Sequence, residues 1–217
     1  MSNKEKILMV MPVMKGGGAE RVASLLLNEF SRNGYDCEFL LTSSDKNDVI
    51  NRDLNPDIPV TSVYSCKKNN IIFKMLELIS SLLCKPFELF GIPVPACFAY
   101  LSFVSQYHAE IKALRNKLKN EPKTKVISFL QPSVPITLIS AKNLPNRIVI
   151  SERGDPKRLL KKRYGYNFIK KYYQRADAVV FQTNDASPAA LQAAAKCIVE
   201  NHSGHFPTTE ADIRALP

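Results

Sequence analysis

Three consecutive glycines, Gly16, Gly17 and Gly18, follow a short apolar run near the start of the chain and precede Glu20 and Arg21. Because glycine has no Cβ, the backbone N–H groups of such a turn can come close to a ligand. A helix that begins there adds its N-terminal donors and the positive end of its dipole, which together suit a diphosphate. The spacing matches neither a Walker A loop nor G-x-G-x-x-G. We predict that these five residues bind substrate; a tight strand-to-helix turn is the structural alternative.

A charged string, SERGDPKR, follows another apolar run later in the chain. If that run is a strand of an open parallel sheet, the string lies at the carboxyl edge, where ligands bind. Carboxylates such as Glu152 and Asp155 can orient a hydroxyl or accept a proton, and Arg153 can hold a phosphate oxygen. We predict catalytic roles for Glu152 and Arg153, and substrate binding by Asp155, Lys157 and Arg158. The alternative is a charged loop that caps the next helix.

The chain has 217 residues and a formal net charge of +10, from 30 Lys and Arg against 20 Asp and Glu. The excess is concentrated: residues 67–125 carry 10 basic and 4 acidic side chains, and residues 153–175 carry 9 and 1. This distribution favours a localised anionic partner, such as phosphate, nucleic acid or a membrane surface. A hydrophobic content of 45% excludes disordered and fibrous classes.

The first basic block also contains apolar sequence. Apolar residues recur at helical spacing over residues 71–84, and residues 89–109 carry no formal charge. Two prolines interrupt the uncharged stretch, which disfavours a membrane-spanning helix and favours a helical pair resting on an anionic bilayer. The alternative is a helix packed on its own sheet. The lysines expected at the lipid headgroups are Lys67, Lys68, Lys74 and Lys85.

Short apolar runs alternate with amphipathic ones along most of the chain, as in a doubly wound, mainly parallel α/β sheet. Strands are predicted over residues 7–11, 37–42, 59–64, 125–130, 147–151 and 178–182. Helices are predicted over residues 19–33, 71–84, 99–118, 134–142 and 159–175, and an alanine-rich helix over 189–199. Gly34 follows the first helix and is expected to end it with a positive φ.

Five widely spaced cysteines without a CxxC pair favour reduced thiols over a disulfide framework or a zinc site. The apolar run at the start of the chain is short and leads into glycines, so we predict a buried strand instead of a signal peptide. Together these features predict a cytoplasmic protein, with peripheral contact to the inner face of the membrane through its lysines.

Residues 5–185 resemble the N-terminal domain of the family-four retaining glycosyltransferases, which have the GT-B fold. The strings that carry the resemblance are ILMVMP, GGGAERV, LLNEF, GYDCEFLLT, VISERGDP and ADAVVFQT, in the order of that family. The resemblance implies a Rossmann-like domain and transfer of a sugar from a nucleotide-sugar donor, with retention and without a metal or other cofactor. It also implies a sugar or lipid-linked acceptor of the kind used in cell-surface polysaccharide synthesis.

By the same resemblance, the loop Gly16–Gly18 approaches the donor diphosphate or the acceptor in the interdomain cleft, and Glu152 and Arg153 lie on the cleft wall. The cleft histidine of the family is not recognisable, since His108 falls in a predicted helix. Such enzymes need a second Rossmann-like domain of comparable size for the donor, and the sequence stops before one. We therefore expect little or no transfer by this chain alone.

Residues 191–207 and 213–217 resemble a segment of A/G-specific adenine DNA glycosylases of the endonuclease III superfamily. This predicts two parts, a glycosyltransferase domain over residues 1–185 and a short helical tail over 186–217, joined in a chimeric or truncated reading frame. An ordinary alanine-rich helix is the alternative for the tail. The alternative functions are a DNA-repair glycosylase chimera and a non-catalytic membrane-surface domain. DNA is not the expected partner, because the basic blocks lie outside the tail.

Overall fold

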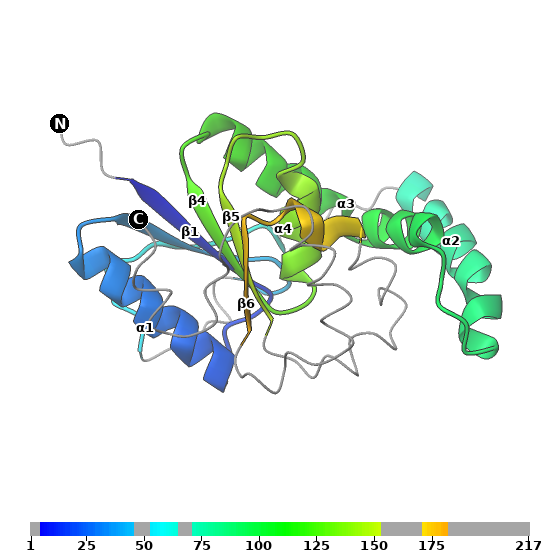
Figure 1. The fold of residues 1–217 in the computed structure, drawn as a ribbon, viewed down its shortest axis with the longest axis horizontal. Coiled ribbons are helices and arrows are strands. Elements are labelled where there is room, and N and C mark those ends of the chain that lie inside the picture. The colour runs from blue at the N-terminus through cyan, green and yellow to red at the C-terminus, as the bar shows by residue number, and fades with distance from the viewer. Residues whose placement is uncertain (1–4, 46–52, 65–70, 153–170, 182–217) are drawn as a thin grey trace. The chain divides into compact units, whose positions relative to one another are not determined.

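The computed structural model describes residues 5–45, 53–64, 71–152 and 171–181 (Figure 1). The chain forms two compact units, of which one comprises Met1–Lys68 and Ala109–Ser151 and the other Asn69–His108 and Glu152–Pro217. The predicted boundary at residue 185, the tail and most of the predicted helix 159–175 lie outside the described residues.

Six strands form one sheet in the order β3-β2-β1-β4-β5-β6. The pairs β1–β2, β1–β4, β2–β3 and β4–β5 are all parallel. The prediction of a doubly wound, Rossmann-like parallel sheet is confirmed, and each strand falls within one or two residues of its predicted position. The strands are β1 (Lys6–Met11), β2 (Asp36–Leu41), β3 (Val60–Ser62), β4 (Lys125–Phe129), β5 (Ile148–Glu152) and β6 (Ala178–Phe181).

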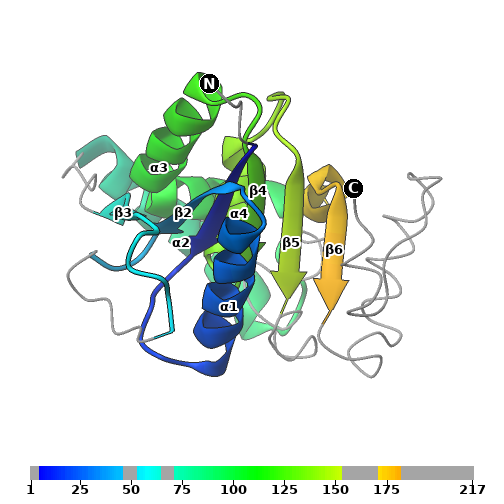
Figure 2. The same ribbon diagram turned by 90° about the vertical axis from the view of Figure 1, so that its left-hand side faces the viewer.

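Helix α1 (Gly18–Arg32) follows the glycine turn and lies along one face of the sheet near β1 (Figure 2). Its apolar residues recur at helical spacing, so that Ala23 and Leu27 are buried against the strands. The helix ends as predicted: Gly34 has a φ of 89°, and its N–H donates to the carbonyl of Ser31 at 3.1 Å.

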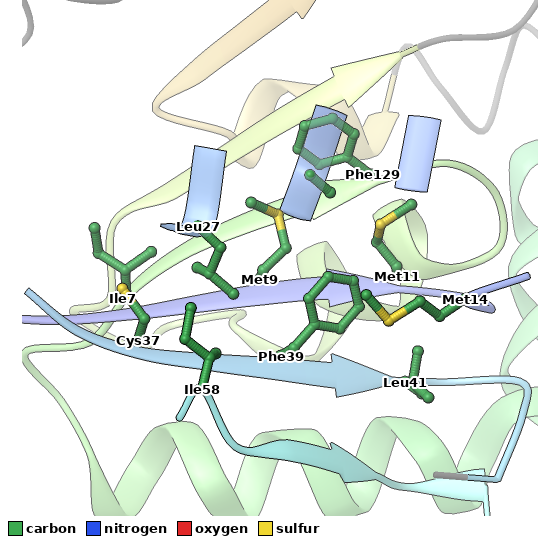
Figure 3. Close-up of a cluster of buried hydrophobic side chains, with 11 residues drawn as sticks. Ile7, Met9, Met11, Met14, Leu27, Cys37, Phe39, Leu41, Ile58 and Phe129 are labelled. Atoms are coloured by element: carbon green, nitrogen blue, oxygen red, sulfur yellow. The ribbon is translucent and has the colours of Figure 1, made fainter. Parts of the chain in front are cut away.

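The core of this unit lies between α1 and the sheet. Figure 3 shows Met9 of β1, Phe39 of β2 and Phe129 of β4 gathered beside Leu27 of α1. These four side chains are 0–1% exposed. The register places Met9 beside Phe39 on one side and Ile127 on the other. Burial of side chains of this size stabilises the unit by roughly 1.5–3 kcal/mol each, which fixes the strands whose ends form the site.

Helix α4 (Ser133–Ser140) follows β4, and every one of its residues is buried. Such a helix must satisfy its polar side chains internally. Thr137 donates to Ser128 Oγ of β4 at 3.1 Å, and Ser140 donates to the carbonyl of Ile111 at 3.0 Å. These bonds connect α4 to the sheet and to the neighbouring helix.

The other unit contains α2 (Ile71–Leu89) and the first half of α3 (Ala96–Asn120), which has a kink at Tyr107. Both helices were predicted, but the expected end of α2 at Cys84 is wrong, because the helix continues through Pro86. Proline fixes a φ that a helix accepts, but it removes the hydrogen bond that residue 86 would donate to the carbonyl four residues earlier, and its ring crowds that carbonyl. Within the described residues, no helix is long and apolar enough to cross a membrane.

Candidate functional site

The strand order reverses beside β1: the chain passes from β1 to β2 on one side, and later to β4 on the other. In open parallel sheets the carboxyl ends of the strands at such a switch point form the usual ligand site. The turns that leave this point are the glycine turn after β1 and residues 130–132 after β4. Both turns belong to the same unit.

The glycine turn has the backbone that the sequence predicted. Gly16 has a φ of 83°, a conformation that side-chain-bearing residues rarely adopt. Gly17 is the N-cap of α1 in extended conformation and has no side-chain cap, and Gly18 is the first helical residue. All three are exposed. The turn therefore presents bare backbone and a helix N-terminus at the switch point.

The side chain of Glu20 restricts which ligands the glycine turn can bind. The residue is only 8% exposed, and its carboxylate lies so close to Gly17 that a Cβ there would collide with Oε2. A Cβ on Gly18, in contrast, would meet open space. A carboxylate in the first turn interacts favourably with the positive end of the helix dipole. The protein's own carboxylate thus occupies the surroundings of the helix N-terminus that a diphosphate would otherwise use.

Arg21, the fifth residue of the predicted group, faces a different segment. Its Nε lies 3.5 Å from Oδ2 of Asp53, and both side chains are well exposed. The same segment is held to α1 by Asn28, whose Nδ2 donates to the Asp53 carbonyl and whose Oδ1 accepts the N–H of Asn55 at 2.8 Å. Exposed pairs of this kind contribute little stability, so Arg21 remains available to an anionic ligand.

The turn after β4 is strained. Leu130 has a φ of 62°, which is unfavourable for a bulky residue. The peptide bond between Gln131 and Pro132 is cis. The fully buried Ser133 begins α4, and its Oγ lies 2.7 Å from Oγ1 of Thr42 at the end of β2. Strained backbone of this kind persists where the surroundings enforce it, often at binding sites. This turn was not predicted from the sequence, although an X-Pro pair directly after a strand was a signal.

Ser44 adds a polar group near the same edge, just beyond β2. Its Oγ is buried and has no hydrogen-bond partner among the described residues. Its carbonyl accepts a hydrogen bond of 2.6 Å from Ser62 at the end of β3. Buried hydroxyls are normally paired, so this side chain is a free donor and acceptor close to the carboxyl edge.

The second predicted group is only partly described. Glu152 is the last residue of β5, and Ser151 accepts at its carbonyl the N–H of Leu130 at 3.5 Å. The backbone at the end of β5 therefore lies beside the strained turn, as the carboxyl-edge argument predicted. The rest of this group, Arg153, Asp155, Lys157 and Arg158, lies outside the described residues.

A separate ionic cluster lies near the amino ends of β1 and β2. The buried Glu38 accepts hydrogen bonds from Lys6 at 2.9 Å, Lys117 at 2.8 Å and Thr61 at 2.7 Å. Burial acts to raise the pKa of Glu38, but the hydrogen bonds from Lys117, Lys6 and Thr61 hold that pKa below its ordinary value. Burial also opposes the charge of Lys6, yet Glu38 and Glu121 hold its pKa above the ordinary value. Because every charge is paired, we assign this cluster a structural role.

Three other predictions concern the second unit and the cysteines. His108 lies in α3 as predicted, stacked on Phe73 with ring centroids 3.7 Å apart. Lys74 and Lys85 are exposed on α2, whereas Lys67 and Lys68 lie outside the described residues. In the described ranges, no disulfide joins the cysteines, and no three His, Cys, Asp or Glu side chains come together as a metal site would require.

No protein-family model and no curated protein matches the chain in sequence. Among solved structures, the chain is similar to the crystal structure of Acinetobacter baumannii MurG, with a TM-score of 0.47 and 15% identity. The match covers 85% of this chain and 42% of that chain, so the protein spans less than half of its neighbour. The Rossmann-like class of the fold rests on the strand order itself.

Proposed function

We propose that the chain is the acceptor-side half of a retaining, nucleotide-sugar-dependent glycosyltransferase of the GT-B type. One observation carries the proposal: an exposed glycine turn and a strained turn leave adjacent strands at the switch point of a parallel sheet. Open sheets place ligands there, and the glycine turn lies within the strings that resemble family-four enzymes. The proposed partners are a nucleotide sugar and a sugar or lipid-linked acceptor, without a metal.

The groups at this edge suit a polyhydroxyl ligand. The Glu20 carboxylate and the Ser44 hydroxyl can hydrogen-bond to sugar hydroxyls, and the bare backbone of the glycine turn allows close approach. In the proposed reaction the bond from the anomeric carbon to the donor phosphate breaks, a bond to the acceptor oxygen forms, and the acceptor proton leaves with the diphosphate. Glu152 is proposed to orient the acceptor hydroxyl, and Arg153 to hold a phosphate oxygen.

Acceptor binding is the first test. The chain is titrated with a polyprenyl-diphosphate-linked sugar in detergent, and we expect saturable binding. Gly17→Ala is expected to weaken it several-fold, because the new methyl group displaces the Glu20 carboxylate. Gly18→Ala is the matched control, since its methyl group meets open space. No binding by the folded wild-type chain, or equal losses in both variants, would overturn the assignment of this edge.

Turnover is the second test. A panel of nucleotide sugars is incubated with the chain and the same acceptor, and release of the nucleoside diphosphate is followed. We expect none, because half a cleft cannot exclude water or surround the developing charge. Sugar transfer by the 217-residue chain alone would show that it is a whole enzyme, contrary to the proposal.

A non-catalytic membrane-surface domain is the second candidate function. The observation that favours it is the concentration of exposed apolar side chains between Ile71 and Ile92. Peripheral membrane contact also fits the first candidate, because a lipid-linked acceptor must be reached at a bilayer surface.

A further inference from the structure

Helix α2 exposes an unusual amount of apolar surface. Seven large apolar side chains between Ile71 and Leu83 are 41–74% exposed. Single exposed apolar residues are common on protein surfaces, but a continuous row of this length marks an interaction surface. These seven side chains and the segment 89–92 that follows them are called the apolar face of α2.

The apolar face occupies one side of the helix. At about 100° per residue, the exposed apolar positions fall within an arc of about 140°. The buried residues Ser80 and Cys84 lie on the opposite side. That side also carries Phe73, which stacks on His108 of α3, and Phe87, whose ring centroid lies 6.0 Å from that of Phe98. Among the residues that the structure describes, helix α3 therefore covers the inner side of α2 and leaves the apolar face exposed.

The charged residues of α2 are ordered around this face. Lys74 and Lys85 are both exposed and eleven residues apart, which is about three turns, so they align along one border of the arc. Glu77 and Glu88 have the same separation but lie further round the helix, away from the apolar residues. Cations thus border the apolar face, and carboxylates are set back from it. This order is typical of a helix lying at the headgroup level of a bilayer.

The segment directly after α2 extends the face. Leu89, Phe90 and Ile92 are 82%, 74% and 54% exposed. The backbone there is closed by bonds from the N–H of Phe90 to the carbonyl of Pro86, and from Ile92 to Phe87 at 2.8 Å. The apolar side chains at this end of the helix therefore sit on an ordered turn and present an apolar tip.

We propose that the apolar face of α2 seats the protein on an anionic lipid bilayer. The helix lies in the plane of the interface, its apolar arc enters the boundary between headgroups and acyl chains, and Lys74 and Lys85 contact lipid phosphates. The partner follows from charge complementarity, because the cations Lys74 and Lys85 line the border of the apolar arc, and the carboxylates of α2 are set back from it. The proposal deepens the proposed function by naming the surface that would bring the chain to a lipid-linked acceptor.

Vesicle co-sedimentation of the full chain tests it. Phosphatidylcholine vesicles are compared with vesicles that also contain phosphatidylserine, and preferential binding to the anionic ones is expected. Leu82→Glu is expected to weaken this binding at least tenfold, because a carboxylate on the arc opposes insertion. Leu25→Glu is the matched control, since Leu25 is equally exposed, at 52% against 55%, but lies on α1. Circular dichroism checks that both variants are folded.

A second pair of variants tests the lysine border. Lys74→Gln with Lys85→Gln is expected to reduce binding roughly twenty-five-fold at low salt, since each lysine near an anionic surface contributes about fivefold. Lys119→Gln with Lys123→Gln removes the same charge from exposed positions outside α2 and is expected to have a much smaller effect.

Three results would overturn the proposal: no binding by the folded wild-type chain, equal losses in each matched pair, or dispersal of a dimer by Leu82→Glu without vesicle binding. The last result would assign the face to a second copy of the chain. The vesicles contain no sugar acceptor, so failure here leaves the sugar-transfer proposal standing, and failure of acceptor binding leaves this one standing.

Discussion

Two buried glutamates of this protein lie in different surroundings and have different roles. Glu38 lies among Lys6, Lys117 and Thr61, and its charge is compensated on every side. Glu20 is also buried but lies against a bare glycine turn and a helix N-terminus. The first arrangement holds strands together, whereas the second leaves a carboxylate beside the surface to which we assign the ligand.

Replacing Glu20 tests how its charge controls the glycine turn. Glu20→Gln is expected to raise the affinity for inorganic pyrophosphate about tenfold, because a like charge beside the anion is removed. It should lower the stability of α1 by about 0.5 kcal/mol through the lost dipole interaction. Glu29→Gln removes the same charge from the other end of α1 and should leave pyrophosphate binding unchanged. Isothermal titration calorimetry measures the affinity of each variant for pyrophosphate. Equal affinities in the wild type and Glu20→Gln would contradict the prediction.

Replacing Glu38 tests the ionic cluster. Glu38→Gln leaves Lys6 and Lys117 without their shared carboxylate and is expected to cost about 2 kcal/mol at pH 7. Because the folded-state pKa of Glu38 is lowered, its stabilisation is present above the unfolded value of about 4.3 and is lost as pH falls through the folded value. Urea denaturation between neutral and acidic pH should show the two proteins converging. A difference in the free energy of unfolding that stays constant at acidic pH would contradict this assignment.

Elements were more predictable than contacts. Alternating buried runs and helical spacing predicted every described strand and the helices α1 to α4, because both patterns record burial directly. The glycine turn was predictable too, since glycine readily adopts the positive φ that a tight strand-to-helix turn requires. The bond between Thr42 and Ser133 and the Glu38 cluster were not, because they join residues tens of positions apart. No local pattern records such pairings.

The end of α2 shows where a local rule misleads. The helix was predicted over residues 71–84, before Pro86, but α2 runs on to Leu89. Pro86→Ala is expected to restore the missing hydrogen bond and to stabilise α2 by about 1 kcal/mol. Thermal denaturation followed by circular dichroism should show a higher Tm. A lower Tm would mean that contacts of the proline ring stabilise the protein more than the restored hydrogen bond does.

At the scale of the whole molecule, charge separates the predicted tail from the rest of the chain. Residues 186–217 contain only two basic side chains, Lys196 and Arg214, against three acidic ones. The resemblance of this tail to DNA glycosylases and the basic surface of the chain therefore come from different segments. A DNA affinity that arises from net charge alone should not depend on the tail.

Anisotropy titration of a labelled DNA duplex at several salt concentrations checks this. Lys196→Gln with Arg214→Gln is expected to leave any affinity unchanged, whereas Lys161→Gln with Lys162→Gln, in the block 153–175, is expected to reduce it and to lower its salt dependence. A loss confined to the tail variant would instead favour the DNA-repair alternative.

Helix α4 is held at three points by three hydroxyls. Ser133 bonds to Thr42, Thr137 to Ser128, and Ser140 to the carbonyl of Ile111. With bonds in three directions, the helix can neither slide along its axis nor roll about it without breaking one of them. The Leu130 turn directly precedes α4 and is therefore held in place together with it. A ligand that binds at that turn would therefore meet a conformation that forms during folding and is preorganised for binding.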